Sequence, residues 1–209
     1  MLANYKILFW DFDGVIKESV EVKTDAYLSL FSEFGSGLQK RIREHHESNG
    51  GVSRFEKIPL YLNWAGQSEN IETVNDYCLR FSKTVFQKVI DSPWVPGVQR
   101  YLRLNSQRQS NVLVTATPQK EIEEILSHLR MMGMFKMVFG APVRKSDAIR
   151  EVLQTENVSL NQACMIGDSD SDYDAAAKNG IQFVLRKTQE NVEFQKRCKT
   201  HMISDFLNE

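Results

Sequence analysis

Hydrophobic positions follow one pattern at the start of the chain and a different one in the segment that comes next. Residues 7–10, ILFW, form an uninterrupted apolar run, which is typical of a strand whose two faces are both covered. Residues 17–90 instead carry apolar side chains at helical spacing and few strand signals. After residue 97, short apolar runs alternate with helical stretches. This alternation predicts an α/β fold with a doubly wound parallel sheet, interrupted after its first strand by an all-helical segment.

The same pattern predicts the individual elements and two domains. In the helical segment we expect helices over residues 20–34 and 38–47, one that Ser53 caps, and one over residues 70–90. Beyond it we expect strands over residues 111–115, 137–140, 163–167 and 181–185, with helices over residues 99–107, 117–132, 146–154 and 172–179. The tail, residues 190–207, is predicted to be helical. A core domain would comprise residues 1–16 and 93–209, and a helical domain residues 17–92.

Composition narrows the class of protein. Of the 209 residues 42% are hydrophobic and 25% charged, and the formal net charge of −1 gives no sign of a nucleic-acid or anionic-membrane partner. No apolar run approaches the length of a membrane span, and Asp11 and Asp13 interrupt the region where a signal peptide would be hydrophobic. Cys78, Cys164 and Cys198 fit neither a zinc pattern nor a disulfide framework and are expected to be small buried residues. We therefore expect a cytoplasmic protein.

The first candidate functional residues come directly after the first predicted strand. Asp11 and Asp13 are two positions apart, so their side chains point to the same side of an extended chain. Two carboxylates so placed repel one another unless a cation lies between them or one of them is protonated. Gly14 allows the backbone to turn where a side chain would obstruct it. Taken alone, the segment is more typical of a surface turn whose acidic residues are solvated.

Further polar groups follow the other predicted strands. Thr115 ends the second strand, Lys145 comes shortly after the third, and residues 167–172, GDSDSD, follow the fourth. Because all strand ends of a parallel sheet point to one edge, we expect these groups to converge there. Carboxylates, a hydroxyl and a lysine suit Mg²⁺ and a phosphate. A calcium-binding loop is the alternative, but Tyr173 and Asn179 stand where such a loop requires glycine and glutamate.

In chain order, these segments resemble the four motifs of the haloacid dehalogenase superfamily. Residues 11–15 resemble the first motif, Thr115 the second, Lys145 the third and residues 167–172 the fourth. Residues 167–180, GDSDSDYDAAAKNG, match the pattern of the fourth motif throughout. The helical segment is similar to the class-I cap of subfamily I, the group that includes phosphoglycolate phosphatase and β-phosphoglucomutase. The resemblance implies a Rossmann-like core and a helical cap that opens and closes over it.

The resemblance also implies a nucleophile, an acid–base group and a magnesium site. Asp11 would attack phosphorus to give an aspartyl-phosphate, and Asp13, with a raised pKa, would protonate the leaving alcohol and later activate water. Asp11, Asp168 and the backbone carbonyl of Asp13 would hold the magnesium ion. Asp172 would bind a metal-bound water or orient Lys145.

Other residues would bind the phosphoryl group. Thr115 and the backbone amide of Ala116 would hold its oxygens, with Gly14 close to the substrate. Lys145 would neutralise the nucleophile and the transferring group. The third motif is the loosest of the four, so Arg144 stays a rival to Lys145.

Substrate choice is expected to lie in residues 50–57 of the cap. Arg54 and Lys57 are the candidates for contacting an anionic substrate. In the alternative, Ser53 only caps a helix and Arg54 pairs with Glu56 or with another glutamate nearby, Glu47.

A pair of histidines, His45 and His46, raises the question of a second metal site. Their surroundings offer no third ligand at a suitable spacing. We therefore expect them to form a solvated helix end.

The resemblance implies a magnesium-dependent phosphatase acting on a sugar or acid phosphate. Its partner would be a small phosphate ester, with no nucleic acid or membrane, and the chain would be a monomer or a weak dimer. Asp13 argues against a dehalogenase, and Lys23 stands where related mutases carry a cap histidine. A phosphonatase using Lys23 or Lys57 for a Schiff base stays open, as do a mutase and a non-catalytic phosphate-binding or regulatory module. A receiver-like signalling domain would need neither Asp13 nor the helical segment.

Overall fold

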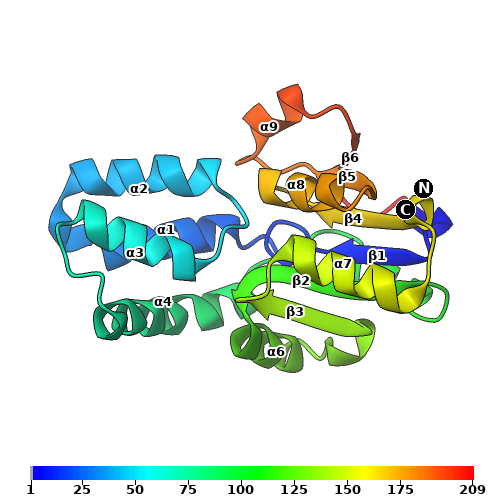
Figure 1. Cartoon of the computed structure of the whole chain (residues 1–209), viewed down its shortest axis with the longest axis horizontal. Coiled ribbons are helices and arrows are strands. Elements are labelled where there is room, and N and C mark those ends of the chain that lie inside the picture. The colour runs from blue at the N-terminus through cyan, green and yellow to red at the C-terminus, as the bar shows by residue number, and fades with distance from the viewer. Residues whose placement is uncertain (1) are drawn as a thin grey trace.

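The computed structural model describes residues 2–209, which form a six-stranded sheet with helices around it and beyond one end (Figure 1). The strand order is β3-β2-β1-β4-β5-β6, and each pair of neighbours is parallel. The strands are β1 (Ile7–Trp10), β2 (Ser110–Pro118), β3 (Met137–Ala141), β4 (Ala163–Gly167), β5 (Gln182–Arg186) and β6 (His201–Ile203). The chain winds outward from β1 in both directions, so the predicted doubly wound parallel sheet is confirmed.

The central strand β1 shows how the sequence builds the layers. All four of its residues are buried. Leu8 and Trp10 belong to one hydrophobic cluster and Ile7 and Phe9 to another, because alternate residues of a strand face opposite sides of the sheet. The main helices of the core are α5 (Val98–Asn105), α6 (Gln119–His128), α7 (Lys145–Glu156) and α8 (Asp170–Lys178). Apolar residues of α5 and α6 complete the first cluster and those of α7 and α8 the second, so both faces of the sheet are covered.

The chain between β1 and α5 contains four α-helices, which we call the helical insert. They are α1 (Val20–Leu30), α2 (Ser36–Ser48), α3 (Arg54–Trp64) and α4 (Ile71–Asp91). Aromatic rings pack in its interior, with centroids 4.2 Å apart for Tyr27 and Phe81 and 5.8 Å apart for Phe31 and Tyr61. Figure 1 shows these helices gathered at one end of the molecule, where α4 packs against α6 of the core. The insert therefore shares a hydrophobic cluster with one face of the sheet.

Two expectations about the core are wrong. A helix was expected from Thr117, but β2 continues to Pro118, which pairs with Ala141 of β3. A helical tail was expected over residues 190–207, but only α9 (Val192–Arg197) is helical and β6 follows it as an edge strand. A strand of three residues carries too little periodicity to be recognised, so its pairing with β5 decides its conformation.

Two simpler expectations concern helix length and cysteines. Among residues 2–209, no helix combines the length and the apolar character needed to cross a membrane. Cys78, Cys164 and Cys198 are buried and unpaired, as the sequence predicted.

Candidate active site

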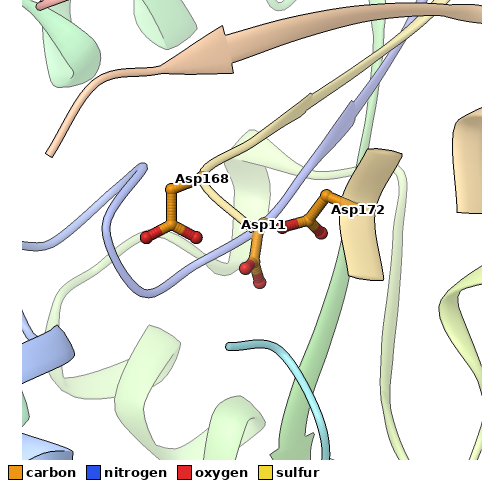
Figure 2. A group of neighbouring side chains, drawn as sticks. All are labelled: Asp11, Asp168 and Asp172. Carbon is orange, nitrogen blue, oxygen red and sulfur yellow. The ribbon is translucent and has the colours of Figure 1, made fainter. Parts of the chain in front are cut away.

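Three carboxylates converge at the carboxyl edge of the sheet (Figure 2). Asp11 directly follows β1, Asp168 directly follows β4, and Asp172 lies in the first turn of α8. One oxygen of each carboxylate lies within 4.8 Å of the others, and all three side chains are buried. They meet because β1 and β4 are neighbouring parallel strands that end within one residue of each other, with Trp10 beside Ile166. The predicted convergence of the first and fourth motifs is thus present in the structure.

Lys145 holds two of these carboxylates together. Its Nζ lies 2.9 Å from Asp11 Oδ2 and 2.6 Å from Asp172 Oδ1. Lys145 is the first residue of α7 and is buried, whereas Arg144 before it is exposed. Between these two rivals, the geometry places Lys145 at the site.

Asp172 is fixed by the start of its own helix. Its Oδ2 accepts hydrogen bonds from the backbone amide of Ser169 at 3.2 Å and from the Ser169 hydroxyl at 2.6 Å. This is a capping box, in which the two ends of the first turn satisfy each other's polar groups. Asp172 therefore has a set orientation and presents its other oxygen to Lys145.

The three carboxylates carry more negative charge than Lys145 can balance. Burial raises the pKa of Asp11 to about 7, although Lys145 acts in the opposite direction. Burial, together with the charges of Asp11 and Asp172, raises the pKa of Asp168 well above its ordinary value. The pKa of Lys145 is also raised, because the charges of Asp11 and Asp172 outweigh the effect of its burial. A hard divalent cation with oxygen ligands fits such a set of donors.

Asp13 has a different environment on the side facing the insert. Its carboxylate accepts a hydrogen bond from Ser19 Oγ at 2.6 Å and forms an ion pair with Lys23 of α1. Lys23 also donates to Thr117 Oγ1 at 2.8 Å. Burial opposes ionisation of Asp13, but Lys23 and Ser19 outweigh it, so the net effect lowers its pKa. The sequence predicted a raised pKa, and that direction is wrong because the prediction did not include Lys23.

Lys23 is the clearest contact that the sequence reasoning missed. The signal was present, because Lys23 lies on the face of α1 that carries the apolar residues Val20 and Tyr27. A lysine at a largely buried helical position requires a partner. The sequence gives no indication that this partner is Asp13, because the contact depends on how the insert packs on the core.

The remaining residues of the first two motifs lie close by. Thr115 is buried in β2, and its Oγ1 accepts a hydrogen bond from the backbone amide of Thr117 at 3.2 Å. Ala116 lines the same cavity as Asp11. Gly14 has a φ of +74°, and a Cβ atom there would overlap the carboxylate of Asp168. A side chain at this position would therefore displace a member of the acidic cluster.

Arg54 connects the insert to the core instead of pairing within the insert. Its guanidinium makes two hydrogen bonds to Glu121 of α6, at 2.8 and 2.6 Å, and one to Ser82 Oγ at 2.6 Å. Its charge also lies over the ring of Phe81, 4.5 Å from the centroid. Ser53 caps α3 as expected, since its Oγ accepts from the backbone amide of Phe55. The partner of Arg54 is thus neither of the two glutamates that the sequence suggested.

Lys57 is buried beside a histidine. Its Nζ lies 2.8 Å from His46 Nδ1, and only 1% of Lys57 and 8% of His46 is exposed. The expectation of a solvated helix end is therefore wrong for His46. His45 is partly exposed and its Nδ1 lies 3.0 Å from the Tyr61 hydroxyl.

One cavity connects the two sets of residues. It has a volume of about 330 Å³, and core and insert both line it. Its charged lining includes Asp11, Asp13, Asp168, Lys23, Arg54 and Lys57. A cavity of this size can hold a small molecule between the acidic cluster and the buried lysine of α3.

Comparison with known proteins agrees with this architecture. A phosphorylated carbohydrates phosphatase from Thermotoga maritima is 27% identical over 84% of this chain and 82% of that protein. A phosphoglycolate phosphatase from Pseudomonas savastanoi is 25% identical over 86% of this chain and 68% of that protein. The crystal structure of a CbbY mutant from Rhodobacter sphaeroides with xylulose-1,5-bisphosphate shares the fold, with a TM-score of 0.77 at 15% identity, over 98% of this chain and 96% of that one.

The family itself follows from a match over most of the sequence. The profile of the haloacid dehalogenase-like hydrolases matches residues 7–186, which include the acidic cluster, Lys145 and the whole insert. The four motifs predicted that membership, and the sheet order and the convergence of the motif residues agree with it. The chain belongs to the haloacid dehalogenase-like hydrolase family.

Proposed function

We propose that this hydrolase is a magnesium-dependent phosphatase that cleaves small phosphate monoesters through an aspartyl-phosphate on Asp11. The observation that carries the proposal is the placement of Asp11. It lies buried between Lys145 and two further carboxylates, on the wall of a cavity large enough for a small metabolite. The relatives' names, which include a phosphorylated carbohydrates phosphatase and phosphoglycolate phosphatases, support sugar or acid phosphates as substrates.

Asp11 is the nucleophile in this proposal. One of its oxygens bonds to phosphorus as the bond to the alcohol oxygen breaks, and water then attacks phosphorus to release inorganic phosphate and regenerate the carboxylate. Lys145 keeps Asp11 in position through its 2.9 Å contact and lowers the charge repulsion between carboxylate and phosphate. Thr115 and the backbone amide of Ala116 bind the phosphoryl oxygens.

Asp13 is the proposed acid and base. It donates a proton to the departing alcohol oxygen and later accepts one from the attacking water. In the structure Lys23 and Ser19 favour its carboxylate form. An entering phosphate adds negative charge nearby, which raises the pKa of Asp13 toward the protonated form that the first step needs.

The donor set fits Mg²⁺. Asp11, Asp168 and the backbone carbonyl of Asp13 would hold the ion, with Asp172 orienting Lys145 or binding a water of the metal shell. When bound, the ion withdraws charge from the phosphoryl oxygens. The raised pKa values of Asp11 and Asp168 support this assignment, because a cation would stabilise both as carboxylates.

We also propose the domain roles that the sequence suggested. Residues 1–16 and 93–209 form the catalytic core, and residues 17–92 form a cap. The contacts that support this are those of Lys23 and Arg54, because each reaches from the insert to a carboxylate of the core. Closure of the cap would exclude water from the cavity during the first step.

The test is phosphate release from para-nitrophenyl phosphate. We expect release with Mg²⁺, its loss with a chelator, and a fall of at least about 10³-fold in kcat for Asp11→Asn. Asp147→Asn is the matched control, because Asp147 is an exposed residue of α7 paired with Arg150, and it should keep wild-type activity. Release that survives in Asp11→Asn would overturn the aspartyl-phosphate mechanism, and release that is indifferent to the chelator would overturn the role of magnesium.

A further inference from the structure

The basic side chains that line the cavity differ in how their charge is balanced. Lys23 pairs with Asp13, Arg54 with Glu121 and Arg197 with Asp170. Lys57 lines the same cavity, but across residues 2–209 no carboxylate lies within salt-bridge distance of it, and its hydrogen-bond partner is His46. This difference separates Lys57 from every other lysine and arginine of the described cavity wall.

The contact with His46 does not supply the missing counter-charge. Burial and the nearby cations hold the pKa of His46 well below its ordinary value, so its imidazole is neutral and its Nδ1 accepts a hydrogen bond from the ammonium of Lys57 without supplying a negative charge. A lysine ammonium has three N–H groups, and His46 takes one of them. The protein thus leaves Lys57 with an unbalanced charge and unused donors at the wall of the cavity.

The surroundings make the ammonium form costly. Burial, followed by the positive charges of Lys23 on α1 and Lys145 on α7, lowers the pKa of Lys57 to about 7, and only Glu56 acts against them. On α2, His46 is neutral, and the pKa of His45 is lowered by burial and by Lys57 itself. An anion beside Lys57 would reverse the balance, because it would stabilise the ammonium.

Building on the proposed phosphatase function, we propose that Lys57 and His46 form a binding site for a second anionic group on the substrate. The substrate is then a small phosphate monoester whose alcohol part carries a carboxylate or a second phosphate. The phosphoryl group lies at Asp11 and the second anion at Lys57, at two places in one cavity of about 330 Å³.

Arg54 is a less suitable receptor for that group. Both of its terminal nitrogens already donate to Glu121, and one also donates to Ser82. An anion at Arg54 would have to compete with Glu121, whose carboxylate is already in place. Displacing Glu121 would leave a buried carboxylate without a partner, which is costly. Lys57 has no such competitor among the described residues.

Kinetics test the proposal with matched esters. The first comparison is between 2-phosphoglycolate and 2-hydroxyethyl phosphate, which share the phosphate and differ in the carboxylate. The second replaces 2-phosphoglycolate by the bisphosphate of ethylene glycol, which carries a second phosphate instead. At pH 7 we expect wild-type kcat/KM to be at least tenfold higher for one or both anionic esters than for the neutral one. In Lys57→Met that ratio should fall at least tenfold, whereas Lys40→Met, which removes an exposed lysine of α2, should preserve it.

Binding without turnover provides a second readout. We would titrate the protein in Mg²⁺ with 3-phosphonopropionate and with propylphosphonate, which cannot be hydrolysed and differ in one carboxylate. At pH 8 most Lys57 is neutral, so the carboxylate should draw a proton onto it. Calorimetry in two buffers of different ionisation enthalpy should show extra proton uptake for 3-phosphonopropionate, and Lys57→Met should abolish that extra uptake.

The outcomes separate the two proposals. Hydrolysis of all esters with ratios that Lys57→Met leaves unchanged would overturn the anion site while the phosphatase function stands. No hydrolysis of any ester, with proton uptake that still depends on Lys57, would overturn the function and retain the site. A preference for only one of the two anionic arms supports the site and identifies its anion. If Lys57→Met does not fold, Lys57→Gln is used instead. The same tenfold fall in the kcat/KM ratio and the same loss of extra proton uptake are expected of it.

Discussion

The core and the insert contribute mostly opposite charges to one cavity. The core side presents the carboxylates of Asp11, Asp13 and Asp168, and the insert side presents the cations Lys23, Arg54 and Lys57. Two charged residues depart from this pattern, Arg197 of the core and Glu47 of the insert. Two of the three insert cations take their counter-charge from the core, Lys23 from Asp13 and Arg54 from Glu121. The third, Lys57, takes none from the described residues.

The paired cations and the unpaired lysine therefore have different roles: the former join the insert to the core, and the latter is available to bind a ligand. The ion pairs of Lys23 with Asp13 and of Arg54 with Glu121 cross between insert and core, and the first of them sets the charge state of Asp13. The unbalanced lysine contributes nothing comparable to assembly, because burying it without a counter-charge opposes folding. Variants at these contacts, and at the loop of the insert that touches the core, test whether the two regions differ in this way.

The largest effect is expected where the two regions are joined by a buried pair. Arg54→Met leaves Glu121 buried without its partner, and breaking such a pair costs roughly 3–5 kcal/mol of the free energy of unfolding. Denaturant unfolding would measure this. Arg150→Met removes the arginine of an exposed pair on α7 and should cost at most about 1 kcal/mol.

The double variant Arg54→Met/Glu121→Met sharpens that prediction. Because an apolar pair avoids the cost of an unpaired buried carboxylate, it should recover most of the stability lost in Arg54→Met. If Arg54→Met alone is as stable as the wild type, then the pair does not join the insert to the core as its geometry indicates.

The second effect concerns the loop of the insert that touches the core site. Gly51 has a φ of +74°, and a Cβ atom there would overlap Ser171 Oγ, lie 2.8 Å from Ser169 Oγ and 3.2 Å from Lys145 Nζ. Gly51→Ala should therefore push the loop away from the acidic cluster. A displacement of about 1 Å at a catalytic site can cost roughly 10²-fold, so we expect kcat/KM for para-nitrophenyl phosphate to fall by about that factor.

Gly66→Ala controls for backbone strain. Gly66 has a similar φ of +67°, but a Cβ atom there has no neighbour within 4 Å among residues 2–209. It should lower stability without lowering kcat/KM. Equal kinetic losses in both variants would mean that strain, and not contact with the core, explains the effect of Gly51→Ala.

The core side of the cavity was predictable from the sequence, and the reason is geometric. Parallel strands end at one edge, so residues that directly follow β1 and β4 must be neighbours, whatever helices lie between them. That rule alone predicts the meeting of Asp11 with Asp168, and the start of α8 then fixes Asp172.

The insert side was not predictable in the same way. The contacts of Lys23 with Asp13 and of Arg54 with Glu121 depend on how a helical bundle docks on the sheet, which no periodic pattern records. Even the contact of Lys57 with His46, within the insert, depends on the packing of α3 against α2. The sequence identified the loop that carries Arg54 and Lys57, but it could not indicate which of the two already had a carboxylate partner.

The third effect is a rise in stability between pH 7 and 9, which we expect from Lys57 and not from an exposed lysine such as Lys40. The pKa of Lys57 is about 7 in the folded protein and near its ordinary value of about 10.4 when unfolded. Between these values the unfolded chain binds more protons, so the free energy of unfolding rises with pH. From pH 7 to 9 the wild type should gain about 2 kcal/mol relative to Lys57→Met.

Denaturant titrations at several pH values would measure this gain. Lys40→Met provides the control, because Lys40 is exposed and should show no such change relative to the wild type. A wild type and a Lys57→Met variant whose stabilities run parallel from pH 7 to 9 would show that Lys57 keeps its charge, and therefore that it already has a counter-charge.

The smallest effect is expected at the pair between Lys23 and Asp13, whose side chains are 14% and 15% exposed. In the wild type the lowered pKa of Asp13 contributes stability that is present above its unfolded value, about 3.9, and is lost as pH falls through the folded value. Lys23→Met removes that contribution and leaves burial as the largest influence on Asp13, which raises its pKa. At pH 7 the variant should be less stable by about 1 kcal/mol, between the values for exposed and buried pairs.

The pH at which this difference disappears is the informative measurement. Protonation of Asp13 removes the charge that Lys23 balances, so thermal unfolding of the wild type and of Lys23→Met should converge as pH falls below about 4. The pH profile of kcat/KM should shift to higher pH, because Asp13 should titrate at a higher pH in the variant than in the wild type. A constant stability difference across that range, with an unshifted profile, would mean that Lys23 contributes packing alone. The protonation of Asp13 would then depend on core residues alone, and the insert would not influence it through the ion pair with Lys23.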